Sequence, residues 1–177
     1  PAHTLTPLKE VALSQADDTS SHNQWNGLLL WPLVVAVLFV LPSLNDGLVS
    51  DDYELIAEGS ISTTDHMLEA FTESGMRGFY RPVPRLLLGI NRAIHGIHPF
   101  GYHLINALVH VAVVIVLVKL LSAVSVGSGI PLIAGVLFAG HFVHVEPVYW
   151  VSARNELMAA LLYLSALWCT TQEERRL

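Results

Sequence analysis

The sequence YHLINALVHVAVVIVLVKLL, residues 102–121, decides the fold. About 20 apolar residues in a helix that rises about 1.5 Å per residue cross the roughly 30 Å of hydrocarbon in a bilayer. The single charged residue of this stretch is Lys119, which lies near one end, where a long side chain reaches the membrane surface. The stretch therefore predicts a membrane-spanning helix.

The composition of the whole chain agrees with this prediction. Of the 177 residues, 53% are hydrophobic and only 14% are charged, whereas soluble domains carry roughly 25% charged residues. The mean hydropathy is +0.51, which excludes both an ordinary soluble domain and a disordered chain. The net charge of −6 argues against a nucleic-acid binder. The single cysteine, Cys169, leaves no internal disulfide and no thiolate metal cage.

Three further apolar stretches predict an all-α, polytopic membrane bundle of about four transmembrane helices. The four predicted spans are residues 26–44, 101–121, 130–147 and 153–171. A secretory signal peptide is the alternative for the first, but its apolar run is long and no basic cluster precedes it. Residues 1–25 are polar and predict a disordered tail. Because the chain begins at Pro1 rather than methionine, we expect a piece of a longer protein, inactive alone.

Residues 45–100 predict a long extracytoplasmic loop that carries short amphipathic helices. Ser62-x-x-Asp65 has the spacing of a capping box, which opens a helix. Further along, apolar residues recur at helical spacing while Arg85 and Arg92 lie on a different face. This pattern predicts a helix in the membrane interface, with its basic side toward headgroups or a phosphate. A basic face that is merely solvated is the alternative.

Within this loop, the aspartate pair Asp51-Asp52 and Arg81 are candidates for catalysis and binding. A carboxylate of Asp51 or Asp52, next to the membrane surface, can act as a general base on an acceptor hydroxyl. Asp51-x-x-Glu54 also has the spacing of a helix start, so a capping role remains open. The proline after Arg81 holds that residue extended and leaves its guanidinium available to a phosphate. A surface arginine in a turn is the alternative.

A polar stripe follows one face of the second predicted span. His103, Asn106 and His110 are spaced i, i+3 and i+7. Polar side chains within the membrane point to a bundle interior, a wet cavity or hydrogen bonds between helices. A bundle interior or a wet cavity favours a path for a substrate or a transported solute, whereas hydrogen bonds between helices involve no chemistry.

The end of the third predicted span is also polar. His141 and His144 share a helical face, and Glu146 follows, so that these residues can bind substrate or hold a divalent metal. A hydrogen-bonded network beside Arg154 is the metal-free alternative, and we expect no metal or other cofactor. If the first span exits outward, the second begins and the third ends on that same side. The polar residues then collect around a groove suited to an anionic, lipid-linked substrate and a hydroxyl acceptor: Asp51, Arg81, His103, His144, Glu146 and Arg154.

Four motifs in this order resemble the N-terminal part of the GT-C glycosyltransferases. They are Val49–Tyr53, Tyr80–Pro82, His98–Asn106 with His110, and the run from Leu137 to Leu157. The resemblance is strongest to the membrane half of the transmembrane-and-TPR O-mannosyltransferases and their bacterial relatives. It covers roughly residues 26–170. The chain departs from the family pattern at His141-Phe-Val-His144, where His-Pro-x-His is frequent, and this leaves the substrate open.

The resemblance implies transfer of a sugar from a polyprenyl-phosphate donor to an acceptor hydroxyl at the extracytoplasmic face. It implies that Asp51, or else Asp52, is the base and that Arg81 and Arg154 hold the carrier phosphate. The acceptor is a protein, a glycan or a lipid. A transporter or channel subunit with a His/Asn pathway and a non-catalytic scaffold are the alternatives. The Ala- and Val-rich helices and scarce lysine favour a bacterial inner membrane, with the endoplasmic reticulum membrane as the eukaryotic counterpart.

Overall fold

The computed structural model describes residues 27, 29–58, 64–74, 78–125, 127 and 129–174, and every regular element in these ranges is helical. The all-α fold predicted from the sequence is therefore confirmed for this part of the chain. The predicted tail, residues 1–25, lies outside the described residues, as does Ser62 of the predicted capping box.

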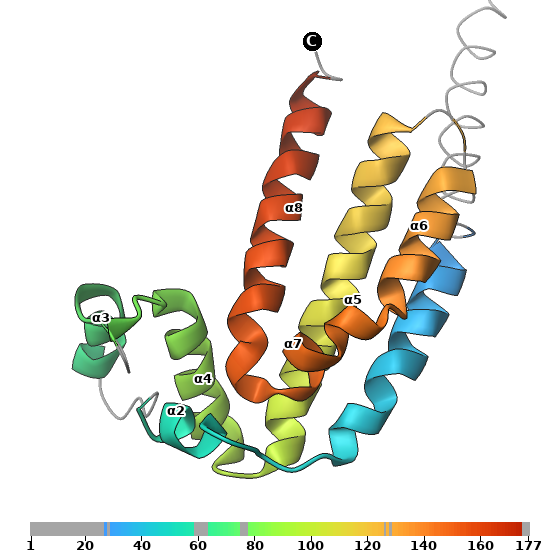
Figure 1. Ribbon diagram of the computed structural model, residues 1–177. Coiled ribbons are helices and arrows are strands. Elements are labelled where there is room, and N and C mark those ends of the chain that lie inside the picture. Colours follow the sequence, from blue (N-terminus) through green and yellow to red (C-terminus); the bar gives the residue numbers. More distant parts are fainter. Residues whose placement is uncertain are drawn as a thin grey trace, which may run out of the picture.

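The long helix α5, Pro99–Val124, is the axis of the bundle. A proline at the first position of a helix is tolerated because the N–H that it lacks has no partner within the helix. α5 packs against α8 (Arg154–Glu174), α6 (Gly129–Ala139) and η1 (Leu41–Asn45), the last turn of the N-terminal helix Leu29–Asn45 (Figure 1). Three core clusters each include one residue of α5, namely Tyr102, Ala107 and Val114. The core therefore follows the length of α5.

The number of helices that qualify as membrane spans is smaller than predicted. Within the described residues, α5 is long and apolar enough to cross a bilayer alone. A second span is reached if α6 and the segment Phe142–Tyr149 are counted together, although they are bent by 47°. The N-terminal helix is apolar but shorter, and α8 opens on the polar residues Arg154, Asn155 and Glu156. The described residues thus contain one or two candidate spans, and the predicted number of about four is not confirmed.

The third predicted span, residues 130–147, is not one continuous helix. The predicted span runs to Pro147, but α6 ends at Ala139 and Pro147 lies within the short helix α7, Val145–Tyr149. Between them runs the 3-10 turn η3, Phe142–His144, whose first free N–H, that of Val143, donates to Nδ1 of His141 at 3.2 Å. The imidazole thus caps a new helical turn, and the chain changes direction before the proline.

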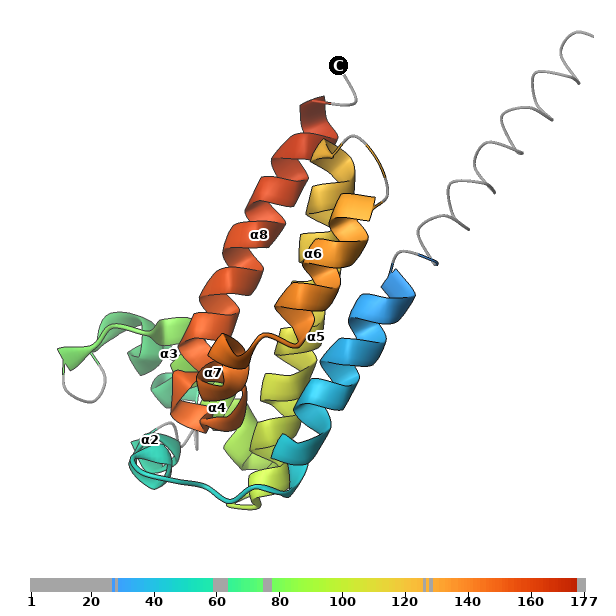
Figure 2. The same ribbon diagram turned by 45° about the vertical axis from the view of Figure 1, so that its right-hand side comes forward.

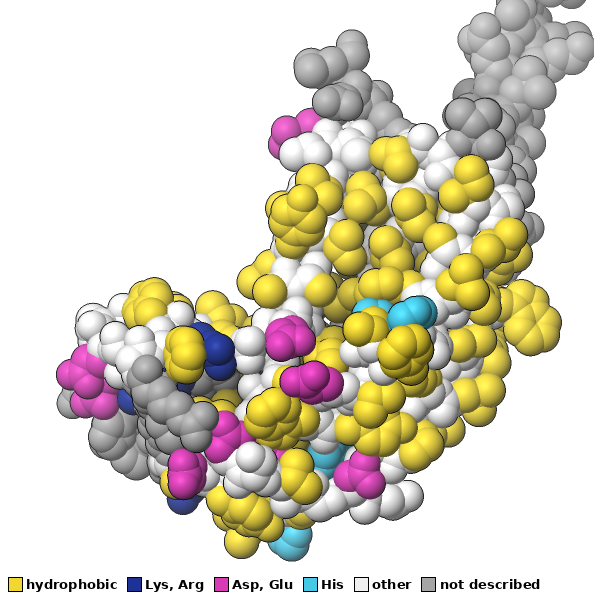
Figure 3. Space-filling view, in the orientation of Figure 1, with side chains coloured by type: hydrophobic (Ala, Val, Ile, Leu, Met, Phe, Trp, Pro, Cys, Tyr) yellow, Lys and Arg dark blue, Asp and Glu magenta, His cyan; other side chains and the backbone are white. Residues whose placement is uncertain are grey.

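The segment between the first helix and α5 forms the three short helices of the predicted loop. They are α2 (Asp52–Glu58), α3 (Thr64–Thr72) and α4 (Pro82–His95). They gather at the end of the bundle where α7 and the start of α8 lie (Figures 1 and 2). Within α4, Leu88, Gly89 and Asn91 are buried, whereas the apolar side chains of Ile90 and Ile94 are 41% and 70% exposed. Charged side chains gather over this end, and the opposite part of the visible face is mostly apolar (Figure 3).

Candidate functional site

The turn before α2 fixes the two adjacent aspartates in different surroundings. Ser50 has a φ of 54°, in the left-handed region that few non-glycine residues adopt. Backbone N–H of Asp52 donates to the carbonyl of Val49 at 3.1 Å, and N–H of Val49 donates to Oδ2 of Asp52 at 3.0 Å. The carbonyl of Asp51 accepts the first hydrogen bond of the helix, from Leu55 at 3.0 Å. Asp51 is therefore the N-cap residue, which is one of the two roles left open for it.

Asp52 is buried and joins two distant parts of the chain. Its side chain is 0% exposed. Oδ1 accepts from the backbone N–H of Ser152 at 2.8 Å and from its hydroxyl at 2.5 Å. Two hydrogen bonds from Ser152 tie the start of α2 to the connection between α7 and α8, and the third, from Val49, closes the turn before α2. This arrangement gives Asp52 a positioning role next to Asp51.

A cavity of about 250 Å³ lies between α2, α4 and the start of α8. Its wall on α4 carries Arg81 and Arg85, whereas its wall on α2 and α8 carries Asp51 and Glu156. The remaining lining residues are Leu55, Ala70, Glu73, Phe79, Pro84, Leu88, Trp150, Ser152, Ala153 and Asn155. The cavity therefore carries both basic and acidic side chains.

Arg81 connects the loop to α8. Its guanidinium lies 4.5 Å from the centre of the Phe79 ring, in a cation–π contact. Nη1 also lies 3.5 Å from Oδ1 of Asn155, which is long for a hydrogen bond. Such weak restraints leave the guanidinium free to turn toward a ligand.

Arg154 does not line this cavity. It is 1% exposed and donates from Nε to Oδ1 of Asn106 at 2.6 Å and from Nη2 to the carbonyl of Tyr102 at 2.9 Å. Nδ2 of Asn106 in turn lies 3.3 Å from the carbonyls of Pro147 and Val148. Arg154 and Asn106 thus hold α5, α7 and α8 together, because a buried charge requires such partners.

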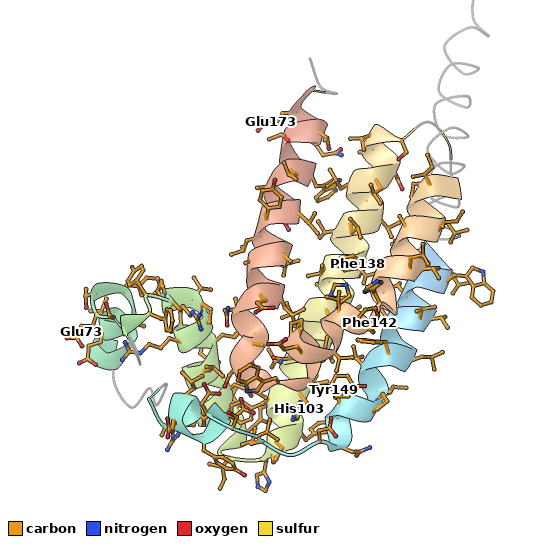
Figure 4. All side chains as sticks on the ribbon, viewed as in Figure 1. Glu73, His103, Phe138, Phe142, Tyr149 and Glu173 are labelled. Atoms are coloured by element: carbon orange, nitrogen blue, oxygen red, sulfur yellow. The ribbon has the colours of Figure 1, made fainter. Side chains whose placement is uncertain are left out.

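The predicted histidine sites lie away from the cavity as well. His103 is completely buried in α5, low in the bundle, and Nε2 of His110 is 3.1 Å from the carbonyl of Ala139 (Figure 4). The ring of His144 lies 5.3 Å from that of His110, centre to centre, while His141 is exposed. Packing between helices therefore accounts for His110 and His144.

Glu146 is exposed on α7 and is not among the residues that line the cavity. No group of three or more His, Cys, Asp or Glu side chains within the described ranges is arranged to hold a metal ion.

The sequence analysis did not predict several of the residues that line the cavity, because it singled out residues next to them. Arg85 was interpreted only as part of a basic helix face, and Trp150, Ser152 and Asn155 were passed over in favour of Arg154. One signal was available: Arg85 follows Arg81 by four residues, so that both lie on one face at the start of α4. For Trp150 the sequence offers no comparable signal.

The fold and the cavity define a helical bundle with one or two candidate membrane spans and a polar site at one end. No family model matches the chain, and no solved structure does. The chain is 37% identical over 99 residues to protein O-mannosyl-transferase TMTC2 of Mus musculus, covering 55% of this chain and 12% of that protein. It is 32% identical over 159 residues to protein O-mannosyl-transferase Tmtc1 of Drosophila melanogaster, covering 84% of this chain and 18% of that protein.

A third relative, protein O-mannosyl-transferase Tmtc2 of Drosophila melanogaster, is 31% identical over 141 residues, covering 73% of this chain and 15% of that protein. The chain is thus related to proteins named as O-mannosyl-transferases, and it matches only a small part of the length of each. The predicted resemblance to O-mannosyltransferases is confirmed at this level.

Proposed function

We propose that this chain is the N-terminal membrane part of a GT-C type glycosyltransferase. The enzyme moves a sugar from a polyprenyl-phosphate donor to an acceptor hydroxyl at the extracytoplasmic face of a membrane. The observation that carries the proposal is the cavity, where Asp51 and Arg81 of the loop meet Asn155 and Glu156 of α8. The relatives' names support mannose as the sugar and a protein as the acceptor. A bacterial inner membrane stays a prediction from composition.

The two sides of the cavity suit a displacement at the anomeric carbon. Asp51 accepts the proton of the acceptor hydroxyl, whose oxygen forms the new bond to that carbon. The bond from the carbon to the phosphate oxygen breaks, and polyprenyl phosphate leaves with the electron pair. Arg81, which also lines the cavity, stabilises the negative charge that develops on this phosphate. Asp52 acts through Asp51, because its three hydrogen bonds hold the turn that carries Asp51.

We further propose that the N-terminal helix, α5, the bent pair α6–α7 and α8 all enter the membrane. Many apolar side chains on these helices face outward, such as Leu38 at 63% exposure and Leu162 at 60%. A bilayer covers such surfaces. The transporter alternative is not favoured, because Asn106 and His110 of the polar stripe are engaged in contacts between helices.

The test of this function is Asp51→Asn in the full-length protein. Loss of a general base lowers the rate by about 10²- to 10⁴-fold, so sugar transfer from a polyprenyl-phosphate donor should nearly cease while the protein still inserts into membranes. Glu54→Gln is the matched control, because Glu54 is an exposed carboxylate on the same helix that does not line the cavity. Transfer at the wild-type rate by Asp51→Asn would remove Asp51 from the mechanism.

A further inference from the structure

Two hydrogen-bond donors of the cavity wall have no partner. Nη1 of Arg85 and Nε1 of Trp150 are both buried, and neither has a hydrogen-bond partner in the described part of the chain. Both residues line the cavity. A buried donor without a partner is unfavourable, and in native proteins it is rare enough to require an explanation. A ligand with acceptor oxygens in the cavity explains both unpartnered donors. A small rotation of either side chain brings its N–H to such an oxygen.

The surroundings of Arg85 favour an anion. Arg85 lies one helical turn after Arg81, so the two guanidinium groups face the cavity from the same wall. This wall is the N-terminal end of α4, and residues from the N-terminal end of α8 line the cavity as well. Helix N-termini carry a partial positive charge, which adds to that of the arginines. The carboxylates of Asp51 and Glu156 also line the cavity.

The other arginines of this region are already engaged. Nη1 of Arg92, on the same helix, donates to the carbonyl of Ile56 at 2.9 Å. Arg154, which the sequence indicated as the second phosphate ligand, donates from Nε to Asn106 and from Nη2 to Tyr102, and its buried Nη1 has no partner among the described residues. Neither Arg92 nor Arg154 lines the cavity. Arg85 is therefore the residue that pairs with Arg81.

We propose that Arg85 and Trp150 bind the sugar phosphate of the donor, Arg85 through a phosphate oxygen and Trp150 through an oxygen of the sugar. The inference rests on the proposed function and adds the residues that recognise its donor. Arg81 and Arg85 together present a forked set of donors to the phosphate, a geometry that suits guanidinium groups. The indole of Trp150 offers one N–H and a flat face, which suits a sugar ring.

The phosphate contact is tested by binding, which does not depend on transfer. The full-length protein in detergent is titrated with farnesyl phosphate, with farnesol and with inorganic phosphate. We expect farnesyl phosphate to bind more tightly than either, and Arg85→Gln to weaken it by about tenfold or more, since a charged hydrogen bond is lost. Arg92→Gln, the matched control on α4, should leave the affinity unchanged. Equal binding of farnesol, or no effect of Arg85→Gln, overturns the inference, and equal binding of inorganic phosphate overturns the lipid-linked donor.

The sugar contact is tested with farnesyl phosphomannose. Trp150→Phe keeps an aromatic ring but removes the N–H, so it should weaken this ligand several-fold and leave the affinity for farnesyl phosphate unchanged. An equal effect on both ligands, or on neither, overturns the role given to Trp150. A wild-type protein that binds these ligands but transfers no sugar would contradict the proposed function and not the binding site.

Discussion

At the scale of single residues, the two adjacent aspartates show how different neighbouring side chains can be. Asp51 lines the cavity, whereas Asp52 is turned inward and bonded to Ser152. The strained backbone of Ser50 precedes both of them. Residues in such a conformation persist where the surrounding structure holds them, and they gather at functional sites. In the proposed mechanism, Asp51 takes part in the chemistry and Asp52 positions it.

The contacts of Asp52 predict graded effects of substitution. Ser152→Ala removes one hydrogen bond to a charged group and should destabilise the protein by about 1.5–3 kcal/mol. Asp52→Asn replaces the charged acceptor of three hydrogen bonds and places an amide N–H₂ beside donors, so it should destabilise the protein more. Thermal unfolding of the full-length protein in detergent measures both.

A positioning role of Asp52 also predicts an effect on sugar transfer. Asp52→Asn should lower sugar transfer strongly and Ser152→Ala moderately, in the same order as their effects on stability, because both act by moving Asp51. Glu54→Gln, on the exposed side of α2, should change neither quantity. If Asp52→Asn were as stable as the wild type and still inactive, Asp52 rather than Asp51 would be the base.

At the scale of elements, the close packing of three helices depends on a small residue as well as on apolar side chains. Gly135 of α6 lies where this helix meets α5 and the N-terminal helix. A Cβ atom at this position would lie 2.5 Å from Cγ2 of Val118 and 3.0 Å from Cγ of Pro32. Three helices therefore approach each other closely at a point where only glycine leaves enough room. Small residues serve the same purpose in membrane helices generally.

Gly135→Ala should therefore destabilise the bundle, by about 1–3 kcal/mol, because an added methyl group overfills a packed contact. Gly129→Ala, at the first residue of the same helix, is the matched control, since a Cβ there meets nothing within 4 Å. Its effect should be neutral or slightly stabilising. Midpoints of thermal unfolding in detergent compare the two variants, and equal midpoints would show that the helices separate freely at Gly135.

At the scale of the whole molecule, the candidate site lies at one end and the apolar surface along the sides. The loop helices, α7 and the start of α8 form the polar end, while Glu173 lies at the far end of α8 (Figure 4). Glu156 and Glu173 are separated by about 25 Å along this helix. If α8 crosses the membrane, as we propose, these two residues lie on opposite sides of it.

Cysteine labelling tests this arrangement. In a Cys169→Ser background, Glu54→Cys and Glu156→Cys should react with a membrane-impermeant maleimide applied to the extracytoplasmic side of sealed cells or vesicles. Glu173→Cys should react only after the membrane is opened. All three residues are exposed in the structure, so protein packing does not shield them. Labelling of Glu156→Cys and Glu173→Cys from the same side would exclude α8 as a span.

The sequence alone determined the helical class and the position of α5, because a long apolar run can satisfy its backbone in lipid only as a helix. It also indicated Asp51 and Arg81, because carboxylate and guanidinium groups beside a predicted membrane surface stand out by chemistry. The end of α6 at Ala139 could not be predicted from the sequence. Pro147 is the stronger local signal for a helix end, whereas in the structure the imidazole of His141 caps a new turn six residues earlier. Only the tertiary structure decided that Arg154 faces Asn106 in the core while Arg85 faces the cavity. The direction of a side chain depends on helices that meet from distant parts of the chain, and no local pattern of residues encodes that meeting.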